Sequence, residues 1–304
     1  MAITRAQIAS RIREGVLVHM NLAAKKRTPI WDKILEIKPS VRAYEQAVMM
    51  YGFGLPRVGN DGSPVQFDIA GEGWSHSLVN DRVKLAFEIT EDAIDDDVYM
   101  SLLPSYGRML EESFRERKEI ATGNIFNYAE TSGYTYGDGK TLLATDHPNS
   151  RPSAGTYQNK LSTAADISES TIESLLTVMG QITNEDGKYM NLQAKSIVVP
   201  IQRQFDAKRI LASSLTPGTN YNAVNVINKD NWIPNGVIAS PYITDDDATF
   251  IITDCPEGLV YLDRMKFKMT RDQEFTTGNI RMKGEERYAI GVFNPRGIVG
   301  TLGA

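Results

Sequence analysis

Apolar residues recur at helical spacing in several stretches of the chain, and the longest of these covers residues 95–129. A rise of 1.5 Å per residue makes the last 25 or so residues of this stretch roughly 35 Å long. Pro104 marks either a kink in the helix or a boundary between two helices. A second amphipathic helix follows further along the chain, with Ser170 and Glu173 as a capping box. The first 50 or so residues predict a partly helical arm that is too polar to bury itself and needs a partner surface.

Alternation of apolar and polar positions predicts strands, most of them in the second half of the chain. In order, the predicted strands cover residues 83–89, 195–199, 237–243, 249–253, 259–262, 266–271, 279–283 and 287–293. A helix is expected over 201–213, and residues 41–50 again follow a helical pattern. Residues 131–165 are rich in Gly, Ser, Thr, Asn and Pro, which predicts a long loop. This order contains no regular βαβ series, so the sequence indicates an α+β fold.

Residues 52–73 are unusually rich in glycine. They hold six glycines and two prolines, with short apolar pieces such as 65–69 between them. The segment Asn60-Asp-Gly-Ser is a strong turn signal. The pattern predicts a long hairpin with little core of its own, and such a hairpin needs another surface for stability. The alternative interpretation is an unattached surface loop.

Composition restricts the class of protein. The 304 residues are 41% hydrophobic and 23% charged, which suits one large or two modest globular domains. No apolar run approaches the roughly 18 residues of a membrane span, and the N-terminus has no signal-peptide pattern. A lone Cys255 excludes an intrachain disulfide and fits a reducing cytoplasm. The net charge of −5 argues against a protein whose main task is gripping nucleic acid, and the basic triplet at 25–27 reads as a solvated stretch.

Candidate chemistry is sparse. The histidines His19, His76 and His147 lie far apart, and only His147 has a neighbouring carboxylate, Asp146, that could orient it as a base. Residues 133–141 nearly match a phosphate-binding loop, but the first glycine stands one residue too early and the predicted strand–helix context is wrong. The aspartate runs 95–97 and 245–247 are explained by a helix start and a turn. We therefore predict no catalytic residue, no cofactor and no metal site.

Three stretches of the sequence resemble the major head subunit family of Mu-like and related tailed bacteriophages, which share the Hong Kong 97 capsid fold. The first is Ile89-Thr-Glu-Asp-Ala-Ile-Asp-Asp-Asp-Val-Tyr, and the second is Asp138-Gly-Lys-Thr-Leu-Leu-Ala-Thr-Asp-His-Pro-Asn. The third runs from Ser196-Ile-Val-Val-Pro through Ala207-Lys-Arg-Ile-Leu-Ala-Ser to Val237-Ile-Ala-Ser-Pro-Tyr-Ile. Their order and spacing are more specific than any of them alone.

The resemblance implies a division of the chain into four parts. Residues 1–45 would be an N-terminal arm, and residues 46–134 would hold the E-loop (about 50–82) and the spine helix of the peripheral domain. Residues 135–255 would be the axial domain and residues 256–304 the strands of the peripheral domain. On the E-loop assignment, the residues expected to contact neighbouring subunits are Arg57, Asp61, Trp74, Asp81 and Arg82.

The function implied is that of a major capsid protein, with no enzymatic activity. Copies would assemble as hexamers and pentamers, in the cytoplasm of the host bacterium, into the icosahedral head of the virion around double-stranded DNA. Expected partners are a portal protein, weakly held DNA and, where present, separate scaffolding and decoration proteins, with no membrane. An encapsulin-like shell for protein cargo is the near alternative. A hydrolase that uses Asp146 and His147 is a remote one.

Overall fold

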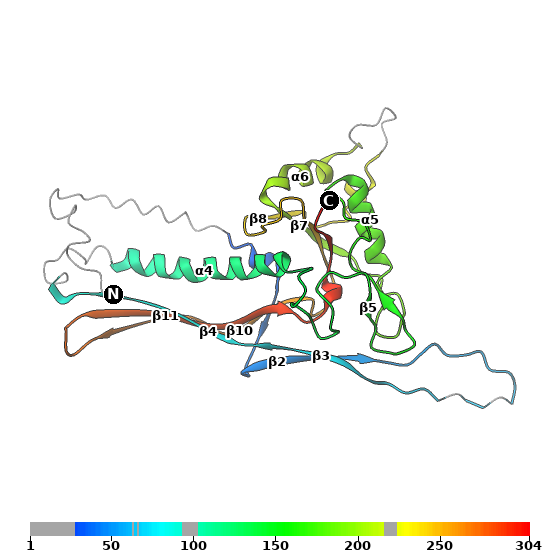
Figure 1. Cartoon of the computed structure of the whole chain (residues 1–304), viewed down its shortest axis with the longest axis horizontal. Helices are drawn as coiled ribbons and strands as arrows, with labels where there is room; N and C mark the ends of the chain where they lie inside the picture. The colour runs from blue at the N-terminus through cyan, green and yellow to red at the C-terminus, as the bar shows by residue number, and fades with distance from the viewer. Residues whose placement is uncertain (1–27, 63, 66, 93–102, 216–223) are drawn as a thin grey trace.

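The computed structural model describes residues 28–62, 64–65, 67–92, 103–215 and 224–304. The molecule is elongated: a long helix and a sheet of long strands form one end, a second sheet with shorter helices lies beside them, and a thin hairpin projects away (Figure 1). Helices and strands are both present, and although the strands at 194–200 and 237–240 pair in parallel across intervening helices, the described residues form no regular βαβ series. The predicted α+β class is therefore confirmed. No helix among the described residues has the length and apolar character needed to span a bilayer.

The first sheet has the strand order β1-β10-β11-β4. Its central strands are β10 (Leu259–Gln273) and β11 (Ile280–Val292), flanked by β1 (Glu36–Pro39) and β4 (Asp81–Ile89). The sequence predicted four short strands in place of β10 and β11, and this was wrong. Irregularities in the β10–β11 register near Met265 interrupt the alternation of side chains without ending either strand.

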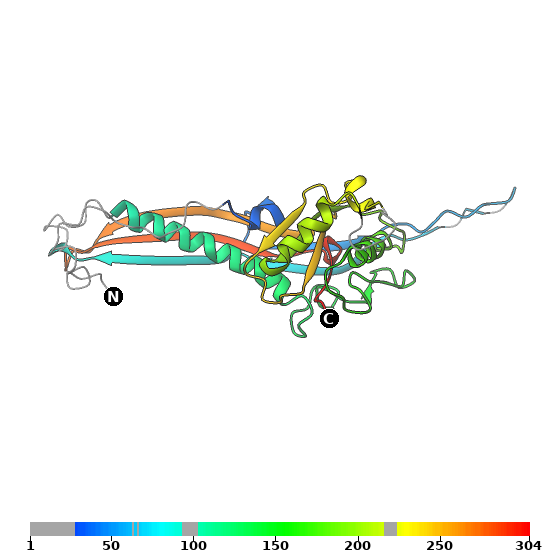
Figure 2. The ribbon, with the colours of Figure 1, turned by 90° about the horizontal axis from the view of Figure 1, so that it is seen from above.

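The helix α4 (Leu103–Asn127) lies along one face of this sheet (Figure 2). The rings of Phe114 and Phe267 meet edge to face at 5.0 Å. Gly284 lies beneath the same helix residue, and a Cβ there would approach Phe114 to 2.9 Å, so glycine lets the helix settle onto β11. Pro104 is the second residue of α4 and marks a helix start, where its missing N–H costs nothing. The predicted residues 95–102 lie outside the described part.

The opposite face of the first sheet is partly covered by a two-stranded ribbon. Its strands are β2 (Tyr44–Tyr51) and β3 (Gly71–Val79), paired antiparallel. Ala47 of β2 packs with buried residues of β10 and β11, and Leu78 of β3 packs against the same cluster. The helix predicted over 41–50 was wrong, because Ala47 is buried by its position on the inner face of a ribbon and not by a helical stripe.

The second sheet has the order β12-β9-β7-β8. Its strands are β7 (Ala194–Pro200), β8 (Val237–Ser240), β9 (Thr249–Thr253) and β12 (Ile298–Thr301). The helices beside it are α5 (Glu169–Gly180), the 3-10 turn η2 (Ile201–Arg203), α6 (Gln204–Ala212) and α7 (Val226–Lys229). The cap of α5 is Ser168, whose hydroxyl accepts the Thr171 N–H, so the capping box predicted at Ser170 was misplaced by two residues.

Short elements connect these units. They are α2 (Trp31–Ile34), β5 (His147–Pro148), β6 (Thr156–Tyr157) and the 3-10 turn η3 (Pro295–Gly297). Residues 131–165 contain only the two-residue strands β5 and β6, in agreement with the predicted loop. Two pairings bear on the expected division of the chain. Strand β1, which that division places in the arm, pairs with β10, and β12, which it places with the peripheral strands, pairs with β9 of the second sheet.

Candidate functional site

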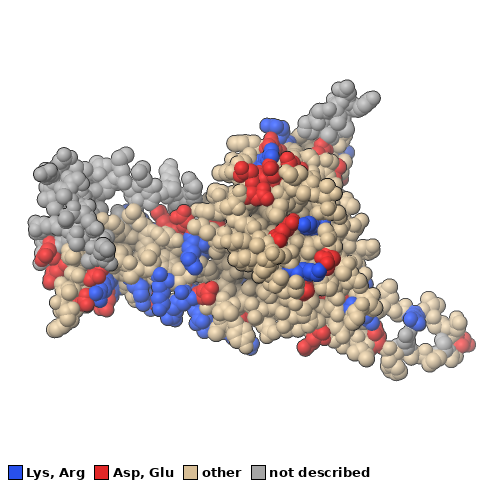
Figure 3. Space-filling model, viewed as in Figure 1, with Lys and Arg blue, Asp and Glu red and all other residues tan. Residues whose placement is uncertain are grey.

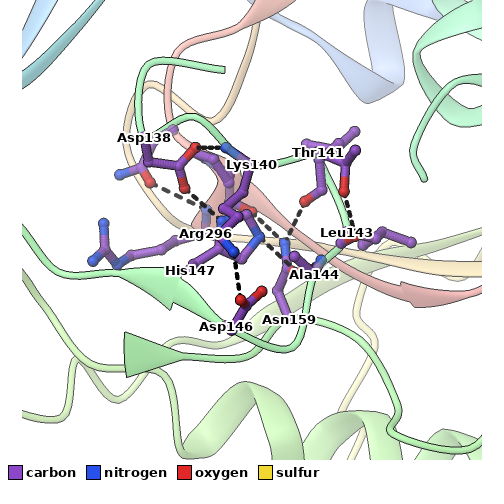
Figure 4. A network of polar contacts seen from close by, with 12 residues as sticks. Asp138, Lys140, Thr141, Leu143, Ala144, Asp146, His147, Asn159 and Arg296 are labelled. Atoms are coloured by element: carbon purple, nitrogen blue, oxygen red, sulfur yellow. Dashed lines mark hydrogen bonds and ion pairs between the residues drawn. The ribbon is translucent and has the colours of Figure 1, made fainter. Parts of the chain in front are cut away.

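His147 lies at the centre of a buried polar cluster (Figure 4). Its side chain is fully buried, and its Nδ1 is 2.5 Å from Asp138 Oδ2. Its Nε2 is 3.1 Å from Asn159 Oδ1, and its ring stacks on Tyr157 with centroids 4.9 Å apart. Asp146, the expected partner, is largely exposed and pairs with Lys140 instead. A histidine that is sealed from solvent and held on both nitrogens cannot reach a substrate, so the proposed Asp146–His147 dyad is not formed.

Asn159 explains why this cluster holds its shape. Its amide nitrogen donates to the carbonyls of Leu142 at 2.7 Å and Pro295 at 3.1 Å. Its amide oxygen accepts the N–H of Ala144 at 3.0 Å. These three backbone groups fix the amide orientation, so both ring nitrogens of His147 face oxygen atoms. The cluster therefore ties the loop after α4 to the turn before β12.

The near match to a phosphate-binding loop belongs to this structural cluster. Asp138, which it supplies, accepts the N–H of Lys140 at 3.1 Å and faces His147. Gly139 adopts a positive φ of 78°, which glycine tolerates. The residues that follow, 141–146, form bends and not the helix that a phosphate site would need. The glycines here shape a turn around a buried carboxylate.

A second buried network surrounds Arg296, whose side chain is 2% exposed. Its guanidinium donates from Nη1 to Glu185 Oε1 at 2.5 Å, from Nη2 to Asn149 Oδ1 at 2.8 Å and from Nε to the Thr183 carbonyl at 2.7 Å. The same guanidinium lies over the Tyr157 ring, 4.1 Å from its centroid. Sequence inspection missed this residue, because an arginine in a Pro-Arg-Gly turn carries no sign of burial. Three of its five N–H donors, one on each nitrogen, join loops of the fold.

The other candidates for chemistry are also used in packing. Asp247 forms an ion pair with Arg203. Burial raises the pKa of the Cys255 thiol to about 12, so at neutral pH it stays protonated and unreactive. Burial lowers the pKa of His76, whose ring lies near Tyr136. Within the described ranges, no three His, Cys, Asp or Glu side chains are grouped to hold a metal ion. His19 and the 95–97 run lie outside those ranges.

The surface feature that stands out is the segment between β2 and β3, residues 52–70, which we call the tongue. None of its described residues belongs to a strand, and it extends beyond the body of the molecule (Figure 1). Its apolar side chains are exposed: Phe53 by 63%, Leu55 by 78%, Val58 by 99%, Val65 by 82%, Phe67 by 93% and Ile69 by 78%. Apolar groups concentrated on a projection and left uncovered by their own chain mark an interaction surface.

The five residues expected to contact neighbours fall into three places. Arg57 and Asp61 are exposed on the tongue. Trp74 lies on β3 with its ring against Gly137 of the same chain, so it packs internally. Asp81 and Arg82 are exposed at the start of β4, with Arg82 opposite Arg287 of β11. The structure therefore does not gather the five into one patch.

The first sheet also exposes a charged face. Beyond the β2–β3 ribbon, the strand register places cations from three neighbouring strands on the face opposite α4. The cations on this face are Arg82, Lys84, Lys268, Arg281, Lys283 and Arg287. Blue side chains gather along the lower edge of this part of the molecule in Figure 3. Three acids lie among the cations: Glu285 and Glu88 pair with Lys283 and Arg281, and Asp272 lies opposite Arg281 in the register of β10 and β11. The sequence predicted charged strands in this region but could not say on which face the charges meet.

Comparison with known proteins gives the family. A model of the family described as phage capsid protein matches residues 81–300. No curated protein sequence matches the chain. The capsid of Myoviridae phage XM1 aligns with a TM-score of 0.60 at 12% identity, over 96% of this chain and 98% of that one. The capsid of a native GTA particle aligns with a TM-score of 0.62 at 11% identity, over 99% of both chains.

A third solved structure, from Mycobacterium phage Che8, aligns with a TM-score of 0.56 at 13% identity, over 95% of this chain and 97% of that one. At such low identities these alignments establish the fold, and the family model covers well over half of the chain. The resemblance expected from the sequence is thereby confirmed. The chain belongs to the phage capsid protein family and has the Hong Kong 97 capsid fold.

Proposed function

We propose that the chain is the major capsid protein of a tailed bacteriophage and that copies assemble as hexamers and pentamers into an icosahedral head around double-stranded DNA. The observation that carries this proposal is the tongue, whose six exposed apolar side chains have no cover in their own chain. A second copy would supply that cover, and closed symmetry would repeat the contact around each ring. In this scheme the tongue is the E-loop, α4 is the spine helix, the first sheet belongs to the peripheral domain and the second to the axial domain.

The remaining partners follow from the same proposal. The virion is the expected location and the host cytoplasm the place of assembly. A portal protein, and scaffolding or decoration proteins made separately, would complete the head. Arg57 and Asp61, which are exposed on the tongue, remain the predicted contact residues there. Trp74 is better placed to hold β3 on its own subunit than to reach a neighbour.

A direct test replaces the apolar side chains of the tongue and keeps its length. The variant Leu55→Ser, Val58→Ser, Phe67→Ser removes only exposed groups, so the subunit should keep its circular dichroism and its melting temperature. A matched control changes three exposed polar residues on α5: Glu173→Ala, Ser174→Ala, Thr177→Ala. Substitution is preferable to deleting residues 55–78, because β3 begins at residue 71 and Leu78 packs on the core.

Electron microscopy of the purified proteins provides the readout. We expect closed shells from the unaltered chain and the α5 control, and folded subunits or small rings from the tongue variant. Normal shells from the tongue variant would overturn the role given to the tongue. An unaltered chain that stays monomeric at every salt and protein concentration, also when a scaffolding protein is co-expressed, would overturn the proposed function. Shells recovered from infected cells with protein inside and no nuclease-protected DNA would indicate a cargo compartment instead.

A further inference from the structure

The tongue has no strand pairing of its own to fix its direction. The β2–β3 ladder ends at Tyr51 opposite Gly71, and the described residues between them form no further strand. A two-stranded segment without a covered face is marginal in water even when it is fully paired. Whatever holds the tongue in place must therefore act at its base.

The base of the tongue is held by charged groups from two loops of the same chain, one between β5 and β6 and one between α5 and β7. Arg151 Nη2 lies 2.7 Å from Asp68 Oδ1 and 2.9 Å from Asp68 Oδ2. On the other limb of the tongue, the Gly54 N–H donates to Asp68 Oδ2 at 2.6 Å, so the same carboxylate also joins the two limbs. Lys188 Nζ donates to the Phe53 carbonyl at 2.7 Å. All of these bonds are made within a few residues of the point where the ribbon ends.

Arg151 stands on a rigid support. Its backbone N–H donates to the carbonyl of Glu185 at 3.2 Å, and its Nη1 is 3.6 Å from Asp186 Oδ1. The preceding residue, Ser150, donates its N–H to the Glu185 carboxylate at 2.5 Å, and that carboxylate is paired with the buried Arg296. Arg151 is thus anchored, through its own backbone N–H and that of Ser150, to the buried network around Arg296.

The electrostatic setting agrees with a persistent contact. The Arg151 guanidinium beside Asp68 and the Gly54 N–H hold the pKa of that carboxyl well below its usual range. The Arg151 side chain is only 19% exposed although its partner lies on a projecting segment. A planar guanidinium fork also restricts direction more than an ammonium group does, which is what a positioning contact needs.

We propose that Arg151 is the positioning residue of the tongue: its bond to Asp68 sets the direction in which the tongue leaves the subunit, and assembly requires that direction. The inference rests on the proposed shell function and adds a residue that acts through a contact within its own chain. Without the bond, the tongue would pivot about its glycine-rich base and meet a neighbouring copy in many orientations. The entropy of ordering it would then oppose docking.

Spin labels measure the direction itself. One label is placed at Val58→Cys, which is 99% exposed, and the other at Ser174→Cys on the exposed side of α5. The native Cys255 is buried with a raised thiol pKa, so it should remain unlabelled, and the unaltered chain serves as the labelling control. Pulsed electron–electron double resonance on unassembled subunits should give one narrow distribution of distances between the two labels.

Charge exchange tests the named pair. Arg151→Asp and Asp68→Arg should each broaden the distance distribution and abolish closed shells, and the double variant should restore both. Arg209→Asp, at a side chain 70% exposed on α6, changes the charge equally and should leave the distribution narrow. A narrow distance distribution in both single variants would overturn the positioning role of Arg151. A broad distribution that persists in the double variant would overturn it as well.

The two proposals fail in different ways. If the single variants show a broad distribution but assemble like the unaltered chain, the direction of the tongue is irrelevant to assembly and this inference is wrong, while the shell function stands. If the unaltered chain itself never assembles, the shell function fails, whatever the labels report. A wrong fold in the single variants would appear as a lowered melting temperature, and in that event Asp68→Asn, which removes the charge with the smallest change in shape, replaces them.

Discussion

The buried guanidinium of Arg296 gives a quantitative test of how the loops beside the second sheet are held together. In Arg296→Ala, Glu185 loses its ion pair while it remains 6% exposed, and Asn149 and the Thr183 carbonyl each lose a donor. Breaking a buried pair by removing one partner costs about 3–5 kcal/mol. The Ser150 N–H still donates to Glu185, which places the cost in the lower half of that range. Loss of the contact between Arg296 and the Tyr157 ring raises the cost again by about 1 kcal/mol.

A loss of that size should lower the melting temperature by roughly 6–10 °C at roughly 2 °C per kcal/mol. The assays, both followed by circular dichroism on the unassembled subunit, are urea unfolding for the free energy and thermal unfolding for the melting temperature. Arg209→Ala, which removes a largely exposed arginine, should cost less than about 0.5 kcal/mol. Adding Glu185→Gln to Arg296→Ala should recover part of the loss, because the stranded charge is then gone. A cost for Arg296→Ala no larger than that of the control would refute the reasoning.

Two further comparisons each set one substitution against a second that serves as its control. Alanine at Gly123 of α4 would bring a Cβ to 2.8 Å from a backbone oxygen and should destabilise the subunit by about 1–3 kcal/mol. Alanine at Gly107 of the same helix meets only ordinary contacts and should stabilise the subunit by about 0.5–1 kcal/mol. Thermal unfolding gives the sign of the change at each site. His147→Ala removes the histidine partner of the buried Asp138 carboxylate and should lower the free energy of unfolding by about 3 kcal/mol or more. Asp146→Ala breaks only an exposed pair with Lys140 and should lower it by less than about 1 kcal/mol. Equal costs for the two substitutions in denaturant titrations would contradict the assignment of Asp138, and not Asp146, as the histidine's partner.

Local sequence patterns predicted the elements that bury a stripe or a face of their own. Strand β9 was expected at its observed bounds, and β7 and α6 to within a residue or a few, because continuous apolar runs and Pro200 punctuate them. The strand β2 was mistaken for a helix, since only Ala47 of its eight residues is buried and the cause of that burial lies in β10 and β11. The pairing of β12 with β9 depends on contacts between distant segments, which no local pattern records.

The candidate site shows the same division. Glycine content and turn signals were enough to predict a projecting segment without a core of its own between residues 52 and 73, although the described residues of 52–70 form no strand. They could not show that Asp68 and Arg151, 83 positions apart, would meet at its base. Nor could they show that His147 pairs with Asp138, since adjacency in sequence favoured Asp146 and only the fold of the loop brings the other aspartate close. Partners across loops are set by tertiary structure.

The strand order of the first sheet constrains how the protein can be synthesised. Strand β4 ends at Ile89, and the strand that pairs with it lies beyond β10, which begins only at Leu259. At about 5–20 residues per second, β4 waits on the order of ten seconds or more for its partner to leave the ribosome. During that time β4, the ribbon and the apolar tongue are present without the sheet that supports them. Long-range pairing of this kind folds slowly and is prone to aggregation, so a cell making many copies at once has reason to supply a chaperone for this chain.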